Sequence, residues 1–171
     1  LTLWLMNNYD PAMVVGSTYR KLADNENAAN AWGPWDPKKY TVEDSSFGFI
    51  KFKNGATVYL RSSWALNYRK PIEAQCILCG DKAGADTLDG KLIINGEKFG
   101  KMYTFEPDLS VGGVAFYEGA STSPTQLEAY TFYSAIIEGT PLRVLPEQAM
   151  MVTKLLAAIY ESSKTGQPVY F

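Results

Sequence analysis

The sequence predicts an α+β fold, in which a large, open and mainly antiparallel sheet has helices packed on one face. The first two-thirds of the chain consists of short β-favouring runs separated by turn residues, including three Asn-Gly or Asp-Gly pairs that favour tight hairpins. The last third instead has apolar residues at helical spacing. Strands followed by helices indicate an antiparallel sheet with helices on one face.

The composition is typical of one globular domain spanning residues 1–171. Hydrophobic residues make up 46% of the chain and charged residues 20%, and the formal net charge is −2. Lys and Arg are scattered among acidic residues, so we expect no nucleic-acid surface. No apolar run approaches the ~20 residues that cross a bilayer, and no signal-peptide pattern opens the chain. We therefore expect a cytoplasmic protein with no membrane contact.

Two residue types limit the chemistry of this chain. Histidine is absent, so any proton transfer would use Lys, Tyr, Asp, Glu or Cys. Cys76 and Cys79 form a C-x-x-C pair in a strand-like run, but the further ligands of a tetrahedral site are missing. We expect no metal site and interpret the pair as free thiols in a reducing compartment.

The first forty residues predict a helix end, a strand and a long loop. Residues 1–6 have helical spacing but are too few to form a stable helix alone, so we interpret them as the end of a helix that begins upstream. Residues 13–22 are expected to form a strand. A polar loop follows at residues 23–40, and its Trp32 and Trp35 need burial either locally or in a ligand cleft.

The clearest hairpin signal lies within residues 42–67. Asn54 and Gly55 predict a two-residue type I′ turn, which would place Phe49 opposite Leu60. In that register both faces carry apolar side chains. We expect the C-terminal helices to cover one face and a partner outside this chain to cover the other.

A meander is predicted to follow. Residues 72–79 form its first strand, and Asp89-Gly90 and Asn95-Gly96 mark its later turns. The stretch 109–122 is expected to be a loop with at most one edge strand.

Two C-terminal helices are predicted from their end signals. The first has Ser123 as N-cap of a capping box and ends at Gly139. The second begins at Pro146 and ends at Gly166. Their predicted buried faces are Ala129, Phe132, Tyr133, Ile136 and Ile137 in the first helix and Ala149, Val152, Leu156, Ile159 and Tyr160 in the second.

Short catalytic motifs are weak in this chain. Tyr160 and Lys164 have the Y-x-x-x-K spacing of short-chain dehydrogenases, but no glycine fingerprint precedes them. No G-x-G-x-x-G is present, so a complete dinucleotide-binding unit is not expected here.

Five segments in order carry a family resemblance: LTLWLM from Leu1, VEDSSFGFIKFKNGA from Val42, SSWALN from Ser62, LCGDKAGA from Leu78 and PEQAMMVTKLLAAIYESSKTGQPV from Pro146. Over nearly its whole length the chain resembles the C-terminal domain of the Gfo/Idh/MocA oxidoreductases, the glucose–fructose oxidoreductase and inositol dehydrogenase family. The resemblance implies a sheet like the C-terminal domain of glyceraldehyde-3-phosphate dehydrogenase. It also implies a parent protein whose N-terminal Rossmann domain, absent from this chain, binds NAD or NADP.

The resemblance further implies a function. The parent is expected to be an enzyme that oxidises a sugar, inositol or related polyol by hydride transfer to NAD or NADP. The family's catalytic residues would precede Leu1, so no catalytic or cofactor-binding residue is assigned here, and the fragment alone is expected to be inactive. The open sheet face is expected to build a homodimer or homotetramer. The alternative is a non-catalytic polyol-binding or assembly module on the same fold.

Four residues are candidates for substrate contact. In related dehydrogenases the segment after the second hairpin strand reaches the site, and here that segment is Asn67, Tyr68 and Arg69. An aromatic ring can stack on sugar C–H groups while an amide and a guanidinium bind hydroxyls. The alternative for this segment is a solvated loop with a capping Arg. Trp35 is the fourth candidate.

Overall fold

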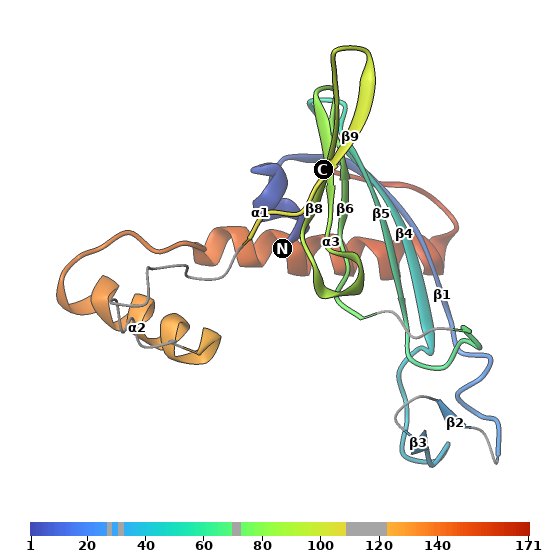
Figure 1. The fold of residues 1–171 in the computed structure, drawn as a ribbon. Helices are drawn as coiled ribbons and strands as arrows, with labels where there is room; N and C mark the ends of the chain where they lie inside the picture. Colours follow the sequence, from blue (N-terminus) through green and yellow to red (C-terminus); the bar gives the residue numbers. More distant parts are fainter. Residues whose placement is uncertain (27–28, 31–32, 70–72, 109–122) are drawn as a thin grey trace. The chain divides into compact units, whose positions relative to one another are not determined.

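The computed structural model describes residues 1–26, 29–30, 33–69, 73–108 and 123–171. The chain divides into two compact units, one made of Leu3–Pro71 with Val144–Phe171 and the other of Leu1–Thr2 with Ile72–Arg143. Each unit contains a four-stranded antiparallel sheet (Figure 1). The predicted α+β class is confirmed, and a single domain over residues 1–171 stays a prediction. The expected loop at 109–122 and Trp32 lie outside the described residues.

The unit that contains the central hairpin has the strand order β10-β1-β4-β5. Its strands are β1 (Pro11–Tyr19), β4 (Ser45–Phe52), β5 (Thr57–Ser63) and β10 (Val169–Tyr170). The short helix α1 (Thr2–Met6) precedes β1 in the chain, and the paired strands β2 (Ala29–Asn30) and β3 (Gly33–Pro34) lie between β1 and β4. The first strand therefore starts and ends slightly earlier than predicted.

The β4–β5 hairpin has a register one residue away from the predicted one, because its turn is longer. Phe49 pairs with Tyr59, the residue before its predicted partner. The Gly55 N–H donates to the Phe52 carbonyl at 3.0 Å, and the Phe52 N–H donates to the Ala56 carbonyl at 2.9 Å. Gly55 has a φ of 93°. A three-residue loop with a left-handed glycine at its end thus replaces the two-residue type I′ turn.

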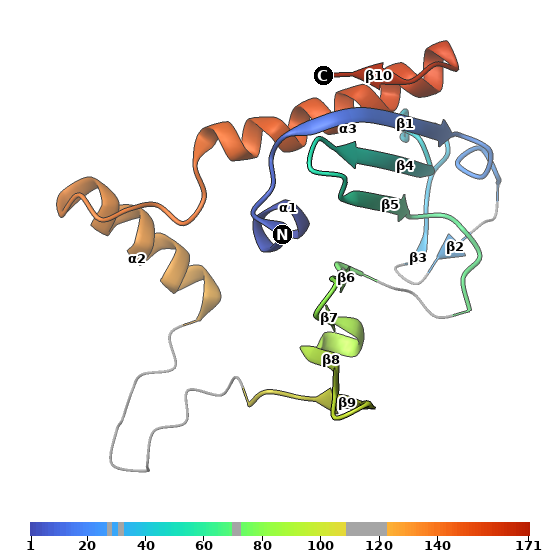
Figure 2. The same ribbon diagram turned by 90° about the horizontal axis from the view of Figure 1, so that it is seen from above.

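This register separates the two faces of the hairpin more cleanly than the predicted one. One face is covered by α3 (Pro146–Thr165), which lies along the sheet in Figure 2. The buried core between them consists of Val14, Ile50, Phe52, Leu155, Ala158 and Ile159, with Val58 and Leu60 of β5 packed against it. The opposite face carries Phe47, Phe49, Tyr59 and Arg61.

Two paired glycines let α3 approach the sheet closely. Gly16 of β1 and Gly48 of β4 are direct cross-strand neighbours. A Cβ on Gly16 would lie 2.6 Å from Cγ2 of Ile159, and a Cβ on Gly48 would lie 2.6 Å from its Cδ1. Ile159 thus fills the space that two side chains would otherwise take, and the distance between helix and sheet depends on both glycines.

Serines of α3 complete the hydrogen bonding of β1 beyond the end of β10, which pairs only with the first half of β1. The Gly16 N–H donates to Ser162 Oγ at 3.0 Å, and the Thr18 N–H donates to Ser163 Oγ at 2.9 Å. Buried N–H groups need an acceptor, so these hydroxyls take the place of a missing strand.

The limits of α3 are as predicted, but its buried face is rotated. Gly166 ends the helix with a left-handed φ of 67°. Val152 and Leu156, both expected in the core, are 41% and 42% exposed. The helix is oriented partly by its serine hydroxyls, and an apolar pattern does not reveal that preference. The residues it buries are Leu155, Ala158, Ile159 and Ser162.

The second unit contains a meander in the order β6-β7-β8-β9. Its elements are β6 (Ile77–Cys79), β7 (Ala83–Asp86), the 3₁₀ turn η1 (Leu88–Gly90), β8 (Ile93–Lys98) and β9 (Lys101–Phe105). A meander is present as predicted, and Asp89-Gly90 lies in η1 between two strands, but residues 73–76 lie outside the first strand that was expected at 72–79.

The turn predicted at Asn95 and Gly96 is wrong, because both residues lie inside β8 and pair with β9. The turn is made by Phe99 and Gly100, whose φ values of 55° and 68° are the positive values that a type I′ turn requires. Gly96 has a packing role instead, since a Cβ there would lie 2.5 Å from the hydroxyl of Tyr103.

Helix α2 (Pro124–Ile137) begins as predicted. Ser123 and Gln126 form the reciprocal capping box, with contacts of 3.3 and 3.0 Å. The predicted apolar stripe of α2 is not buried. Among the residues that the structure describes, Ser134 is the buried residue of this helix. More than half of the surface of each of the following side chains is exposed: Phe132, Tyr133, Ile136 and Ile137.

Candidate functional site

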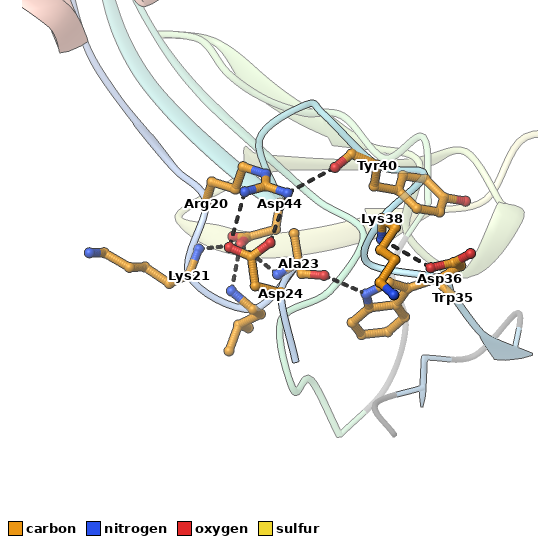
Figure 3. A network of polar contacts seen from close by, with 10 residues as sticks. Arg20, Lys21, Ala23, Asp24, Trp35, Asp36, Lys38, Tyr40 and Asp44 are labelled. Atoms are coloured by element: carbon orange, nitrogen blue, oxygen red, sulfur yellow. Dashed lines mark hydrogen bonds and ion pairs between the residues drawn. The ribbon is translucent and has the colours of Figure 1, made fainter. Parts of the chain in front are cut away.

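A buried carboxylate, that of Asp44, lies directly before β4, at the end of the hairpin opposite its turn. Oδ2 of Asp44 accepts hydrogen bonds from the backbone N–H groups of Lys21, Leu22 and Ala23, at 2.5, 2.6 and 3.2 Å (Figure 3). The Ser45 hydroxyl donates to Oδ1 at 2.9 Å. Successive N–H groups that converge in this way form an anion-binding concavity. The loop after β1 thus wraps around one carboxylate.

The pKa of Asp44 lies below its ordinary value. Burial has the largest single effect and raises the pKa, but the hydrogen bonds from Leu22, Ser45, Lys21 and Ala23 together lower it by more. The carboxylate is therefore ionised at neutral pH and acts only as an acceptor. Its chemistry suits holding a backbone in place.

The main chain of Asp44 joins the same loop to the hairpin. Its N–H donates to the Tyr19 carbonyl at 2.8 Å. Its carbonyl accepts from the Ser63 hydroxyl at 2.8 Å and from the Trp64 N–H at 3.2 Å. One residue therefore connects the end of β1, the start of β4 and the end of β5.

Trp35, Tyr40 and Trp64 form an aromatic cluster beside this connection. The Trp35 ring meets Trp64 edge to face at 5.0 Å, and Tyr40 stacks on Trp64 at 4.9 Å. The Trp35 indole donates to the Ala23 carbonyl at 2.9 Å (Figure 3), and the Trp64 indole donates to the Glu43 carbonyl at 2.8 Å. Trp35 is thus anchored locally and half-buried. Its contact with a substrate stays a prediction.

Asn67, Tyr68 and Arg69 follow β5 and are exposed. The Arg61 guanidinium carbon lies 5.4 Å from the centroid of the Tyr68 ring. Sequence reasoning missed Arg61, because the predicted register put it opposite a glycine, whereas it pairs with Phe47. The structure thus brings an arginine and an aromatic ring together at this end of the hairpin.

A shallow cleft of about 220 Å³ lies between α3 and the ends of β4 and β5. Glu43 and Tyr160 line it, and the Tyr160 hydroxyl donates to Oε1 of Glu43 at 2.5 Å. This hydrogen bond, with smaller effects from burial and from the charge of Glu43, raises the pKa of Tyr160. A catalytic Tyr-Lys pair would need a lowered tyrosine pKa, whereas the hydrogen bond to Glu43 raises the pKa of Tyr160, which does not fit the Y-x-x-x-K interpretation.

The described part of the chain contains no group of three or more His, Cys, Asp or Glu residues placed to hold a metal ion. Cys76 is buried, Cys79 is exposed, and both are free thiols. Among the same residues, no helix is long and apolar enough to span a membrane.

The residues around Asp44 and the end of the hairpin offer aromatic faces, hydrogen-bond donors and a fixed backbone, which are properties of a binding surface.

The chain is similar to known proteins over most or all of its length. The family model described as oxidoreductase family (Gfo/Idh/MocA), C-terminal alpha/beta domain, matches residues 1–171. D-glucoside 3-dehydrogenase of Escherichia coli (strain K12) is 30% identical over 153 residues, which are 89% of this chain and 40% of that protein. The chain thus spans less than half the length of this relative.

Solved structures resemble the chain as well. Aldose-aldose oxidoreductase from Caulobacter crescentus, complexed with glycerol, has a TM-score of 0.66 and 17% identity over 99% of this chain and 44% of its own. An oxidoreductase from Agrobacterium radiobacter, in complex with NAD+, L-tartaric acid and magnesium, has a TM-score of 0.62 and 18% identity over 94% of this chain and 43% of its own. At these identities the likeness establishes a shared fold.

Proposed function

Since the chain belongs to the Gfo/Idh/MocA oxidoreductase family as its C-terminal α/β domain, we propose that it forms the substrate-binding and oligomerisation part of an NAD(P)-dependent dehydrogenase. The substrate is a sugar, inositol or related polyol. The relative that acts on D-glucosides supports this class, and the structural neighbour with bound NAD+ supports the cofactor. The sequence has no G-x-G-x-x-G, so the full-length protein would hold NAD or NADP on residues outside this chain.

The observation that carries the substrate site is the exposed Tyr68 ring with the Arg61 guanidinium at 5.4 Å. A ring presents an apolar face to sugar C–H groups, and a guanidinium donates to hydroxyl oxygens. Asn67 and Arg69 flank this ring in the chain and add polar groups of the same kind. Trp35 would supply a second aromatic surface.

The role of these residues is to bind and orient the substrate. NAD or NADP, when bound, would supply the hydride acceptor for a carbinol carbon of the substrate, and the hydroxyl proton would pass to a base outside residues 1–171. Tyr68 and Trp35 would fix the plane of the sugar, while Asn67 and Arg69 would select its hydroxyl pattern. Orientation of this kind lowers the entropic barrier of the reaction without any proton transfer by this chain.

The experiment measures NADH or NADPH formation by the full-length protein with D-glucosides, free aldoses and inositols. Tyr68→Ala should raise KM by about 2- to 10-fold, since an aromatic contact is worth about 0.5–1.5 kcal/mol. Tyr68→Phe, which keeps the ring, should leave KM nearly unchanged. Equal kinetics for Tyr68→Ala and the wild type would remove Tyr68 from the site. Oxidation of no sugar or polyol would favour a non-catalytic module.

We also propose that the sheet face opposite α3 forms a homodimer or homotetramer. This face carries Phe47 and Phe49, which are half-buried, and Tyr59, which is 81% exposed. Exposed aromatic patches of this kind mark protein interfaces. Light scattering of the full-length protein should show a dimer or tetramer. In the Tyr59→Arg variant the measured particle mass should fall towards that of a monomer. A wild-type monomer at high concentration would contradict this proposal.

A cytoplasmic location fits the free thiols Cys76 and Cys79.

A further inference from the structure

We propose that Asp44 is a positioning residue for the substrate site. Its buried carboxylate and its main chain hold the loop after β1 and the segment after β5 in a fixed relation, so that the candidate residues of both segments are presented to one substrate. This inference rests on the proposed function and adds a residue to its site.

The first connection runs from the carboxylate to Trp35. Oδ2 of Asp44 accepts from the Ala23 N–H at 3.2 Å, and the Ala23 carbonyl accepts from the Trp35 indole at 2.9 Å (Figure 3). Ala23 and Asp44 are both buried. One buried residue, Ala23, thus links the carboxylate to the indole ring through its N–H and its carbonyl, and water does not compete for the buried contact with Asp44.

The second connection runs from the main chain of Asp44 toward Tyr68. The Asp44 carbonyl accepts from the Ser63 hydroxyl at 2.8 Å. The oxygen of that hydroxyl in turn accepts from the N–H groups of Ala65 and Leu66, at 3.2 and 3.0 Å. The Leu66 carbonyl then accepts from the Tyr68 N–H at 2.8 Å. These contacts fix the path of the chain up to the candidate tyrosine.

A negative charge is needed for the first connection. Two carboxylate oxygens accept four hydrogen bonds, three of them from consecutive N–H groups of the loop. Hydrogen bonds to an ionised acceptor are about twice as strong as those to a neutral one. Asparagine has the same shape but presents one neutral acceptor, so the loop would lose most of this attraction while the core stays filled.

The test compares Asp44→Asn with Asp10→Asn in the full-length protein. Asp10 carries an exposed carboxylate whose partner is Lys53 at 2.7 Å, near the turn of the hairpin, so the control makes the same chemical change away from the site. Displacement of binding groups by about 1 Å can lower the reaction rate about 100-fold. We expect KM for the sugar to rise in Asp44→Asn and kcat/KM to fall about 10-fold or more. Asp10→Asn should keep the wild-type KM.

Hydrogen exchange supplies a readout that does not depend on activity. The N–H groups of Lys21, Leu22 and Ala23 should exchange faster in Asp44→Asn than in the wild type and Asp10→Asn. A lowered unfolding temperature with wild-type KM would overturn the proposal, because a residue that only stabilises the fold would behave in that way. Exchange of these three N–H groups at the wild-type rate in Asp44→Asn would overturn the proposal equally.

Two outcomes separate the failure of this inference from that of the proposed function. If the wild type oxidises no sugar or polyol, the proposed function fails, and hydrogen exchange alone decides whether Asp44 orders the loop. If Asp44→Asn does not fold, Ser45→Ala removes one of its four hydrogen bonds and should raise KM in the same direction by a smaller factor. An unchanged KM in Ser45→Ala would then count against the proposal.

Discussion

Replacing Gly48 by alanine would press a methyl group against α3. The new Cβ would lie 2.6 Å from Cδ1 and 3.1 Å from Cγ1 of Ile159. Overpacking a core costs about 1–3 kcal/mol. Cδ1 is the tip of a side chain that can turn, so we expect the free energy of unfolding to fall by about 1 kcal/mol. In Gly16→Ala the Cβ would also lie 3.0 Å from the backbone Cα of Ile159, and that loss should approach about 3 kcal/mol.

A double-mutant cycle with Ile159→Val identifies the clashing atom. Valine lacks Cδ1 but keeps the branch that corresponds to Cγ2, and this change alone should cost about 0.5–1.5 kcal/mol. With Gly48→Ala the clashing atom is gone, so the double variant should lose about 1 kcal/mol less than the sum of the single losses. With Gly16→Ala the clashing atoms remain, and the losses should add.

Urea unfolding followed by near-UV circular dichroism and tryptophan fluorescence gives these free energies. The urea dependence should be the same in all variants, because each change is local. Equal losses for Gly16→Ala and Gly48→Ala would show that the contact with the backbone Cα of Ile159 does not set the cost. Simple additivity of Gly48→Ala with Ile159→Val would refute the reasoning.

Three further predictions concern a turn and two titrating groups. Phe99 has a φ of 55° and is 93% exposed, so Phe99→Asn should raise stability in thermal unfolding by about 0.5–1 kcal/mol, and an equal gain from Phe99→Ala would contradict this reason. The pKa of Tyr160 is raised, so the hydrogen bond from Tyr160 to Glu43 stabilises the fold fully below pH 10.0, and this stabilisation is lost as the pH rises through the folded-state pKa. Tyr160→Phe should abolish that loss at alkaline pH, measured as unfolding temperatures over a pH series. The pKa of Asp44 is lowered, so its stabilisation is present above pH 3.8 and lost as the pH falls through the folded-state pKa; the same acid curve in Asp44→Asn would contradict this account.

The fold class and the helix ends could be predicted because their signals are local. Ser123 and Gln126 satisfy each other within one turn, and Gly166 takes the left-handed conformation that ends α3. Turn type was less accessible. Asn54-Gly55 fits both a two-residue and a three-residue loop, and the strand packing under α3 decides between them. Phenylalanine is not a turn-favouring residue, although Phe99 forms part of the turn between β8 and β9.

The candidate site was only partly predictable. The position of Tyr68 after the second hairpin strand follows from chain order, whereas its neighbour Arg61 depended on the register. Asp44 was missed because an acidic residue before a strand looks like any solvated residue in the sequence. Its partners, Lys21 to Ala23, lie more than twenty positions away and contribute backbone groups that no side-chain pattern reveals.

The serine contacts between α3 and β1 limit how this sheet can be extended. A strand edge with unpaired N–H groups is a template for another strand. Because Gly16 and Thr18 donate to Ser162 and Ser163, β1 offers these donors to no incoming chain. Within this unit, β10 is two residues long, and the long outer edge belongs to β5. Strand addition to this sheet would therefore begin along the strand that leads directly into the candidate substrate segment.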